Sequence, residues 1–162
     1  MASTETTGPS TGSGQAATLR AARPDDLPRV EALLTASELP LDGVADALST
    51  FVVAEHDGRL VGVAGLECCQ DNALLRSVAV DPAWRSHGLG RQLVTRVISE
   101  AEARGIRALY LLTQTAEHYF PSFGFQKVSR DTVPEDIRHT GEFQHACPES
   151  ATVMEKPLSG AT

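Results

Sequence analysis

Residues Leu74–Gly90 read LLRSVAVDPAWRSHGLG. The first seven residues form an apolar run typical of a buried strand, Asp-Pro marks a turn, and the glycines Gly88 and Gly90 precede a run of helical period. Glycine lets the backbone approach a bulky anion, and the free N–H groups at the start of a helix attract one. Arg85 adds a cation at the same point. The stretch therefore predicts a pyrophosphate-binding loop.

Two common phosphate-binding motifs do not fit this loop. The dinucleotide fingerprint needs a third glycine in the order G-x-G-x-x-G, and the ATP-binding P-loop needs Gly-Lys followed by Ser or Thr. Neither occurs here. The spacing Arg-x-x-Gly-x-Gly is short, so its context, with a strand before it and a helix after it, carries the information.

Length and composition predict one domain. A chain of 162 residues suits a single core. Residues 1–17 are almost entirely small or polar, a composition that buries too little apolar surface to offset the entropy of ordering. We expect a disordered tail at 1–17, a domain at 18–158 and a short tail at 159–162. Neither a secretory signal nor a membrane-spanning run is recognisable, so we expect a cytoplasmic protein.

Charge and cysteine content exclude several classes of function. A formal net charge of -7 disfavours a nucleic-acid partner, because phosphate binding needs a clustered basic face. The three cysteines Cys68, Cys69 and Cys147 are odd in number and lack C-x-x-C spacing. We therefore expect no disulfide framework and no metal site.

The pattern along the chain predicts an α+β fold of three layers with a mixed, mostly antiparallel sheet. Asp57-Gly58 suits a tight hairpin turn, and Gly105 suits a left-handed helix cap. Strands are expected at 18–22, 51–55, 59–68, 74–80, 108–112, 125–129 and 152–156. Helices are expected at 24–37, 44–48, 89–104 and 116–120, with one helical turn at 135–138.

This order, the loop at 85–90 and the run Phe123-Gly124-Phe125 together resemble the GCN5-related N-acetyltransferases, the GNAT superfamily, over residues 18–158. The resemblance implies acetyl-CoA as co-substrate and a strand at 74–80 that carries a bulge and splays from its neighbour. It implies that the backbone N–H near Val78 stabilises the oxyanion formed at the thioester. The implied cofactor-binding residues are Val78, Ala79, Val80, Arg85, Ser86, His87, Gly88, Leu89 and Gly90.

Two narrower resemblances concern the acceptor. The runs LLTQTA at 111–116 and VPEDIR at 133–138 are similar to the catalytic domain of amino-acid N-acetyltransferases that acetylate glutamate. The runs LLRSVAV, GEF and CPESA resemble GNAT enzymes associated with arsenic-resistance operons.

The chain departs from the commonest GNAT pattern at one position. Many members place a tyrosine four residues before the glycine of the Gly-Phe pair, where it protonates the departing thiolate, and here that residue is Phe120. Tyr119 is adjacent, but a shift of one residue on a helix rotates a side chain by about 100°. Tyr119 is therefore a weak candidate for a general acid.

The remaining chemistry is assigned to three polar residues. Glu67, near a strand end, is the candidate base that deprotonates the amine, and its alternative interpretation is a solvated rim residue. Arg76 lies within an apolar strand, where it pairs with Glu67 or another acid, or grips a substrate anion such as a carboxylate, phosphinate or arsenical. Thr113 is the second candidate substrate-binding residue.

We therefore expect an acetyl-CoA-dependent N-acetyltransferase acting by direct transfer on the α-amine of a small, anionic, amino-acid-like substrate, with catalytic contributions from Glu67 and Val78. Two alternatives stay open: a catalytically silent domain that binds or senses acyl-CoA, and a thiol-based arsenical-binding protein. Nucleic-acid and membrane partners are not expected, and a homodimer is left open.

Overall fold

The computed structural model describes residues 17–85, 88–113, 116, 118–140, 143 and 151–158. The predicted tails lie almost entirely outside this range, so the proposed domain limits stay a prediction. No helix among the described residues has the length and apolar character needed to cross a membrane.

The elements follow the predicted order closely. The first half of the domain contains β1 (Thr18–Ala21), η2 (Pro24–Asp26), α1 (Leu27–Ala36), α2 (Val44–Ala47), η3 (Leu48–Thr50), β2 (Phe51–His56), β3 (Arg59–Cys68) and β4 (Asn72–Val80). The second half contains η4 (Pro82–Trp84), α3 (Leu89–Ala103), β5 (Ala108–Thr113), η5 (Phe120–Phe123), β6 (Gln126–Val128), η6 (Arg130–Thr132), α4 (Glu135–Arg138) and β7 (Thr152–Pro157).

The described strands form one seven-stranded sheet in the order β1-β2-β3-β4-β5-β7-β6. Every pairing among them is antiparallel except that between β4 and β5. A parallel pair needs a long crossover, and α3 supplies it. The mixed, mostly antiparallel sheet predicted from the sequence is thereby confirmed.

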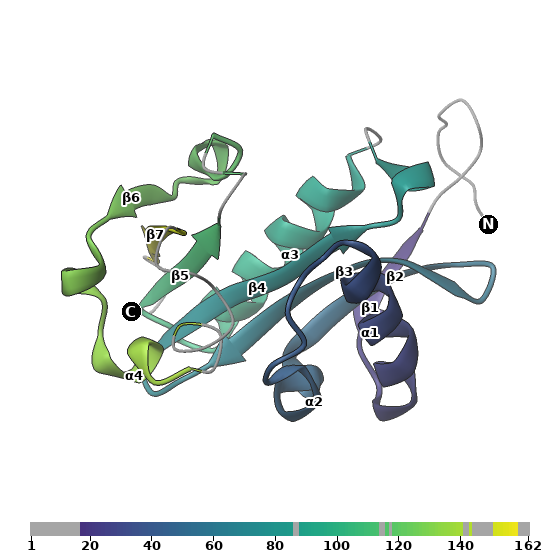
Figure 1. Cartoon of the computed structure of the whole chain (residues 1–162), viewed down its shortest axis with the longest axis horizontal. Coiled ribbons are helices and arrows are strands. Elements are labelled where there is room, and N and C mark those ends of the chain that lie inside the picture. The colour runs from purple at the N-terminus through teal and green to yellow at the C-terminus, as the bar shows by residue number, and fades with distance from the viewer. Residues whose placement is uncertain are drawn as a thin grey trace.

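Helices cover both faces of the sheet, which gives the three layers (Figure 1). On one face α3 packs through Leu93, Val97 and Ala101, the predicted inner stripe of this helix, all with no exposed surface. On the other face α1 packs through Val30 and Leu34. A smaller cluster around Ile137 of α4 covers β5 and β7 on this second face. We call the three groups the α3-side, α1-side and α4-side clusters.

Two local predictions are confirmed by backbone angles. Asp57 and Gly58, between β2 and β3, have φ of 51° and 77°, the paired positive angles that a tight hairpin turn requires. Gly105, directly after the end of α3, has φ of 76° and forms the left-handed cap.

One predicted helix is wrong. The sequence predicted a helix at 116–120 stopped by Pro121, whereas the structure has a 3-10 helix, η5, over Phe120–Phe123 with Pro121 near its start. Proline lacks an N–H and has φ fixed near the helical value, so it is favoured at the first helical position. Pro121 therefore begins a helix here instead of ending one. Tyr119 is its N-cap residue.

The sheet opens in its middle. On β4, Ser77 has φ of 59°, and the register with β3 shifts between Val63 and Gly65, which marks a bulge. The pairing of β4 with β5 runs from Asn72 to Leu74 and goes no further. Beyond Leu74 the two strands separate, so the bulge and the splay implied by the family resemblance are both present.

Candidate active site

A cavity of about 300 Å³ occupies the opening between β4 and β5. Its lining draws on all three hydrophobic clusters: Leu111 from the α3 side, Leu39 from the α1 side and Leu112 from the α4 side. The cavity therefore passes through the sheet. Two reactants could enter from opposite faces and meet within it. We call it the splay cavity.

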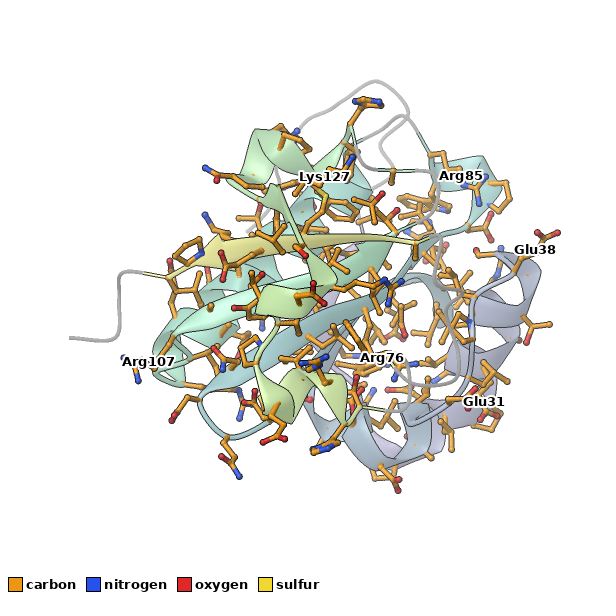
Figure 2. The ribbon with its side chains drawn as sticks, turned by 60° about the vertical axis from the view of Figure 1, so that its left-hand side comes forward. Glu31, Glu38, Arg76, Arg85, Arg107 and Lys127 are labelled. Carbon is orange, nitrogen blue, oxygen red and sulfur yellow. The ribbon has the colours of Figure 1, made fainter. Side chains whose placement is uncertain are left out.

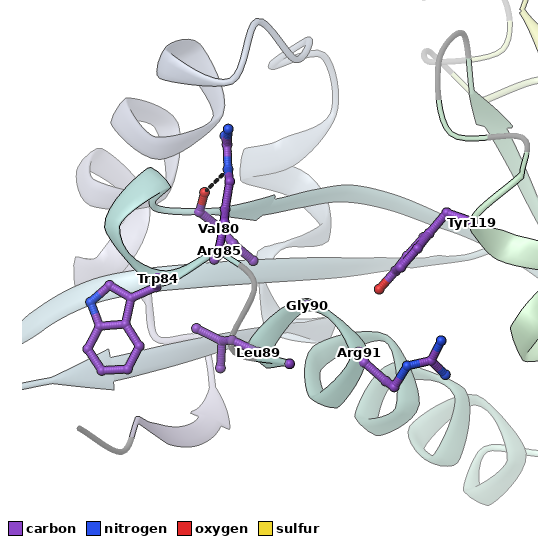
Figure 3. Close-up of a pocket in the computed structure, with 8 residues that line it drawn as sticks. Val80, Trp84, Arg85, Leu89, Gly90, Arg91 and Tyr119 are labelled. Atoms are coloured by element: carbon purple, nitrogen blue, oxygen red, sulfur yellow. Dashed lines mark hydrogen bonds between the residues drawn. The ribbon is translucent and has the colours of Figure 1, made fainter. Parts of the chain in front are cut away.

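A second cavity, of about 270 Å³, lies at the start of α3. Gly88 is the N-cap of α3 with φ of 81°, and no atom of the residues that the structure describes lies within 4 Å of the place where its Cβ would stand. The open space in front of these first helical N–H groups suits an anion. Arg85 is exposed beside it and donates from Nε to the Val80 carbonyl over 3.1 Å (Figure 3). We call this the loop cavity.

The structure brings most of the predicted cofactor residues together around the loop cavity. Its lining includes Val80, Arg85, Gly88, Leu89 and Gly90. Ser86 and His87 lie outside the described residues.

The two remaining strand residues lie apart from the loop. Val78 lines the splay cavity and packs against the α3-side cluster. Ala79 is buried in the α1-side cluster and lines neither cavity, so its side chain is turned away from the predicted cofactor path.

Sequence reasoning missed Arg91, which also lines the loop cavity. Its guanidinium lies 4.5 Å from the centre of the Phe123 ring, and its Nη2 donates to Ser122 Oγ over 2.8 Å. The sequence feature that could have identified Arg91 is its position in the first turn of α3, directly after Gly90. A charged residue at that position is also typical of a solvated helix surface, so the sequence did not distinguish the two.

Arg76 makes the ion pair that the sequence offered as one of two interpretations. Its side chain has no exposed surface, and Nη1 lies 2.9 Å from Glu67 Oε1. Nε donates to Ser77 Oγ over 3.0 Å. Arg76 also lines the splay cavity, so the ion pair does not remove it from the site. Figure 2 shows Arg76 among the strands, whereas Arg85 and Arg107 lie at the rim of the domain.

Besides pairing with Arg76, Glu67 lines a third cavity, of about 560 Å³, which Asp42, Asp46 and Cys68 also line. The Glu67 side chain is 21% exposed. A carboxylate between a reaction cavity and water can accept a proton and pass it on. The predicted base is therefore placed where a proton could leave the site.

Thr113 ends β5 and lines the splay cavity opposite β4. Its Oγ1 accepts a hydrogen bond from the Ala116 N–H over 2.9 Å. The hydroxyl thereby links the end of β5 to Ala116.

Tyr119 and Phe120 differ in the cavities that they line. Phe120 is 8% exposed and lines the splay cavity. Tyr119 lines both cavities and is 39% exposed. Its hydroxyl lies 3.6 Å from the place where a Gly90 Cβ would stand, and Figure 3 shows it pointing toward the start of α3. The phenol is therefore directed at the loop end of the cofactor path.

The described cysteines are poor thiolates. Burial raises the pKa of the Cys68 thiol. Burial, aided by Asp136 and Glu67, raises the pKa of Cys69 to about 12. Cys147 lies outside the described residues. Within the described part of the chain, no group of three or more His, Cys, Asp or Glu side chains could hold a metal ion.

Comparison with known proteins places this geometry in a family. The protein-family model described as "Acetyltransferase (GNAT) domain" matches residues 47–127, half of the chain. An amino-acid acetyltransferase from Mycobacterium tuberculosis is 30% identical over 129 residues, which are 74% of each protein. An amino-acid acetyltransferase from Aeromonas salmonicida is 34% identical over 69% of this chain, but this chain spans 25% of its length.

A solved structure with ligands bound has a similar fold. N-acetylglutamate synthase from Neisseria gonorrhoeae, complexed with coenzyme A and N-acetyl-glutamate, superposes with a TM-score of 0.77 at 25% identity. The match covers 96% of this chain and 37% of that chain.

Proposed function

The chain belongs to the GNAT acetyltransferase family, and on this premise we propose that it transfers the acetyl group of acetyl-CoA to the amine of a small, anionic, amino-acid-like substrate. The observation that carries the proposal is the splay cavity, which joins the two faces of the sheet next to an anion-binding loop. A cofactor held at the loop and an amine entering from the other face would meet between β4 and β5.

The loop cavity fits the cofactor's pyrophosphate. Gly88 and Gly90 leave its backbone open, since neither position has a side chain and no atom from the described part of the chain fills the space beside Gly88. Arg85 supplies an exposed cation, and Val78 and Val80 border the path from the loop to the splay cavity. Acetyl-CoA, once bound, supplies an activated carbonyl group.

Three groups of this chain would act on the reactants. The backbone N–H near Val78 would stabilise negative charge on the carbonyl oxygen, since it is fixed in place before the reaction. Glu67 would accept the proton of the amine and release it through the third cavity, which it lines. A neutral amine is required because an ammonium nitrogen has no free electron pair.

Arg76 and Thr113 would bind the substrate's anionic group at the splay cavity. A guanidinium can offer two parallel donors to a carboxylate, phosphinate or arsenical oxyanion. The N-acetyl-glutamate in the N. gonorrhoeae structure supports an amino acid as the acceptor. The partnership of Arg76 with Glu67 would then place the anion-binding group beside the base.

The experiment is a panel of amines offered to the purified protein with acetyl-CoA. The panel includes glutamate, other α-amino acids, amino-acid analogues bearing phosphinate or arsenical groups, and a simple alkyl amine. We expect free thiol to appear only when an anionic amino-acid-like acceptor is present. Acetyl-CoA binding by calorimetry without thiol release from any acceptor would indicate a silent acyl-CoA-binding domain and contradict the proposal.

A further inference from the structure

Ser77 is the extra residue in the bulge of β4, and it presents a buried hydroxyl at the splay cavity. It is 8% exposed and lines the cavity together with Arg76 and Val78. Its φ of 59° is unusual for a residue with a side chain. Such a conformation persists only where surrounding contacts impose it, and it occurs often at functional sites.

The oxygen of the Ser77 hydroxyl is positioned by a neighbouring side chain. Oγ accepts a hydrogen bond from Arg76 Nε over 3.0 Å, so one of its lone pairs is occupied. Among the described residues, no hydrogen bond donated by the Ser77 hydroxyl is found. A buried donor without an acceptor costs free energy, and a ligand in the cavity would remove that cost.

The path proposed for the cofactor leads to this hydroxyl. From the loop cavity the path runs beside Val80 and then Val78, and Ser77 follows on the same strand. A strand rises about 3.3 Å per residue, so Ser77 lies roughly 10 Å beyond Val80. At this inner end the aromatic ring of Phe120 brings no polar group, and Tyr119 points back toward Gly90.

We propose that the Ser77 hydroxyl, oriented by Arg76, donates a hydrogen bond to the sulfur of acetyl-CoA as the carbon–sulfur bond breaks. The inference rests on the proposed acetyl transfer. It gives Ser77 the contact with sulfur that the tyrosine hydroxyl would make if Phe120 were tyrosine.

The step balances without any proton leaving Ser77. The amine nitrogen bonds to the carbonyl carbon and loses its proton to Glu67, while the electron pair of the carbon–sulfur bond stays on sulfur. CoA departs as a thiolate and takes a proton from water after release. Ser77 keeps its own proton because an alkoxide is a far stronger base than a thiolate. Its contribution is to stabilise the charge on sulfur.

The first test measures the pKa of the CoA thiol in the binary complex, from the ultraviolet absorbance of the thiolate. A hydrogen bond to the charged sulfur lowers this pKa. We expect Ser77→Ala to raise it by about one to two units relative to the unmodified protein. The calorimetric Kd for CoA at a pH where the thiol is neutral should stay within about threefold, because Ser77 is remote from the loop. An unchanged thiol pKa would overturn the inference.

Kinetics supply the second test, and two further variants serve as comparisons. Ser77→Ala should lower kcat by about tenfold to a hundredfold with little change in the KM for acetyl-CoA. Ser77→Gly also lacks the hydroxyl but relaxes the backbone angle, so it should match Ser77→Ala. If Ser77→Gly instead restores the activity and the thiol pKa, the backbone and not the hydroxyl is responsible.

Thr113→Val removes the hydroxyl on the opposite wall. This variant should leave the pKa of the bound CoA thiol unchanged. If Thr113→Val raises that pKa and Ser77→Ala does not, Thr113 contacts the sulfur and the role proposed for Ser77 is refuted. The unmodified protein separates this inference from the proposed function. Thiol release by the unmodified protein, with no effect of Ser77→Ala on pKa or kcat, refutes the role of Ser77 alone.

Discussion

At the scale of single residues, the site depends on a guanidinium with no exposed surface. Arg76 is compensated for its loss of hydration by Glu67 at 2.9 Å and by Ser77 at 3.0 Å. Removing either partner from a buried charge is costly. Arg76 therefore supports the structure of β3 and β4 and, by our proposal, binds substrate with the same side chain.

Arg76→Lys separates these two roles. Lysine keeps the charge but loses the planar, two-pronged donor, so a substrate anion should bind less well. We expect the KM for the amine to rise by about tenfold to a hundredfold, with the KM for acetyl-CoA changed by less than about threefold. Steady-state kinetics and thermal unfolding on one preparation check this. A clear drop in Tm with an unchanged amine KM would leave Arg76 with a structural role only.

Tyr119→Phe tests the orientation of the phenol. Because its hydroxyl points toward the start of α3, we do not expect it to protonate the departing thiolate. kcat should stay within about threefold, whereas loss of a general acid lowers it by about a hundredfold or more. A loss of that size in kcat, measured at saturating substrates, would show that Tyr119 reaches the sulfur.

At the scale of elements, the site is the junction of β4 with α3. The bulge at Ser77 directs Val78 toward the α3 side, and the left-handed Gly88 turns the chain into α3. At the loop itself, Gly88 and Gly90 present backbone N–H groups without side chains. Substitutions that add a side chain at the loop should therefore act on binding.

Gly88→Glu or Gly90→Glu should abolish CoA binding, since a side chain and a negative charge would stand where the pyrophosphate binds. Gly105→Glu is the matched control for Gly88→Glu. Gly105 lies just beyond the opposite end of α3, with φ of 76° against 81° for Gly88, and both positions have open space around the missing Cβ. The two variants should lose similar thermal stability, but only Gly88→Glu should lose CoA affinity by calorimetry. Unchanged affinity in a folded Gly88→Glu variant would contradict the assigned loop.

At the scale of the whole molecule, a charge network attaches the first strand and helix to the sheet. Asp26 is fully buried and accepts hydrogen bonds from Arg20, Arg29 and the Arg23 N–H. Arg20 also bonds Glu55 of β2. The hydrogen bond from Arg20 is the largest cause that lowers the pKa of the Asp26 carboxyl well below its usual range.

Asp26→Asn should lower the free energy of unfolding by about 2 to 3 kcal/mol near neutral pH, because the arginines lose their shared carboxylate. A lowered pKa in the folded state means that the carboxylate stabilises the protein at pH above its unfolded pKa, near 4, and less as the pH falls further. The stability of the unmodified protein should thus fall more steeply below about pH 4 than that of Asp26→Asn. Denaturant unfolding across pH measures this, with the exposed neighbour Asp25→Asn as control. Equal loss in both variants would refute the network's role.

The sequence by itself determined the features that depend on neighbours along the chain. The hairpin turn at Asp57-Gly58, the cap at Gly105 and the inner stripe of α3 follow from local backbone preference and from periodicity. The sequence also singled out Arg85, Gly88, Leu89 and Gly90, which line one cavity, because these residues are close together along the chain. The prediction of a helix at 116–120 was wrong although it depended on a local feature, Pro121, because proline can start a helix as well as end one.

Tertiary structure decided which side chains meet. Simple alternation along β4 from Leu75 would turn Ala79 toward α3, but the bulge at Ser77 reverses the alternation, so Val78 and Val80 face α3 instead. The contact between Arg76 and Glu67 needs the register of two neighbouring strands, and the sequence could offer it only as one of two possibilities. The splay cavity exists because β4 and β5 separate after Leu74. Such contacts arise from pairing between distant segments, and a period of two residues means that one inserted residue exchanges the faces of every residue beyond it.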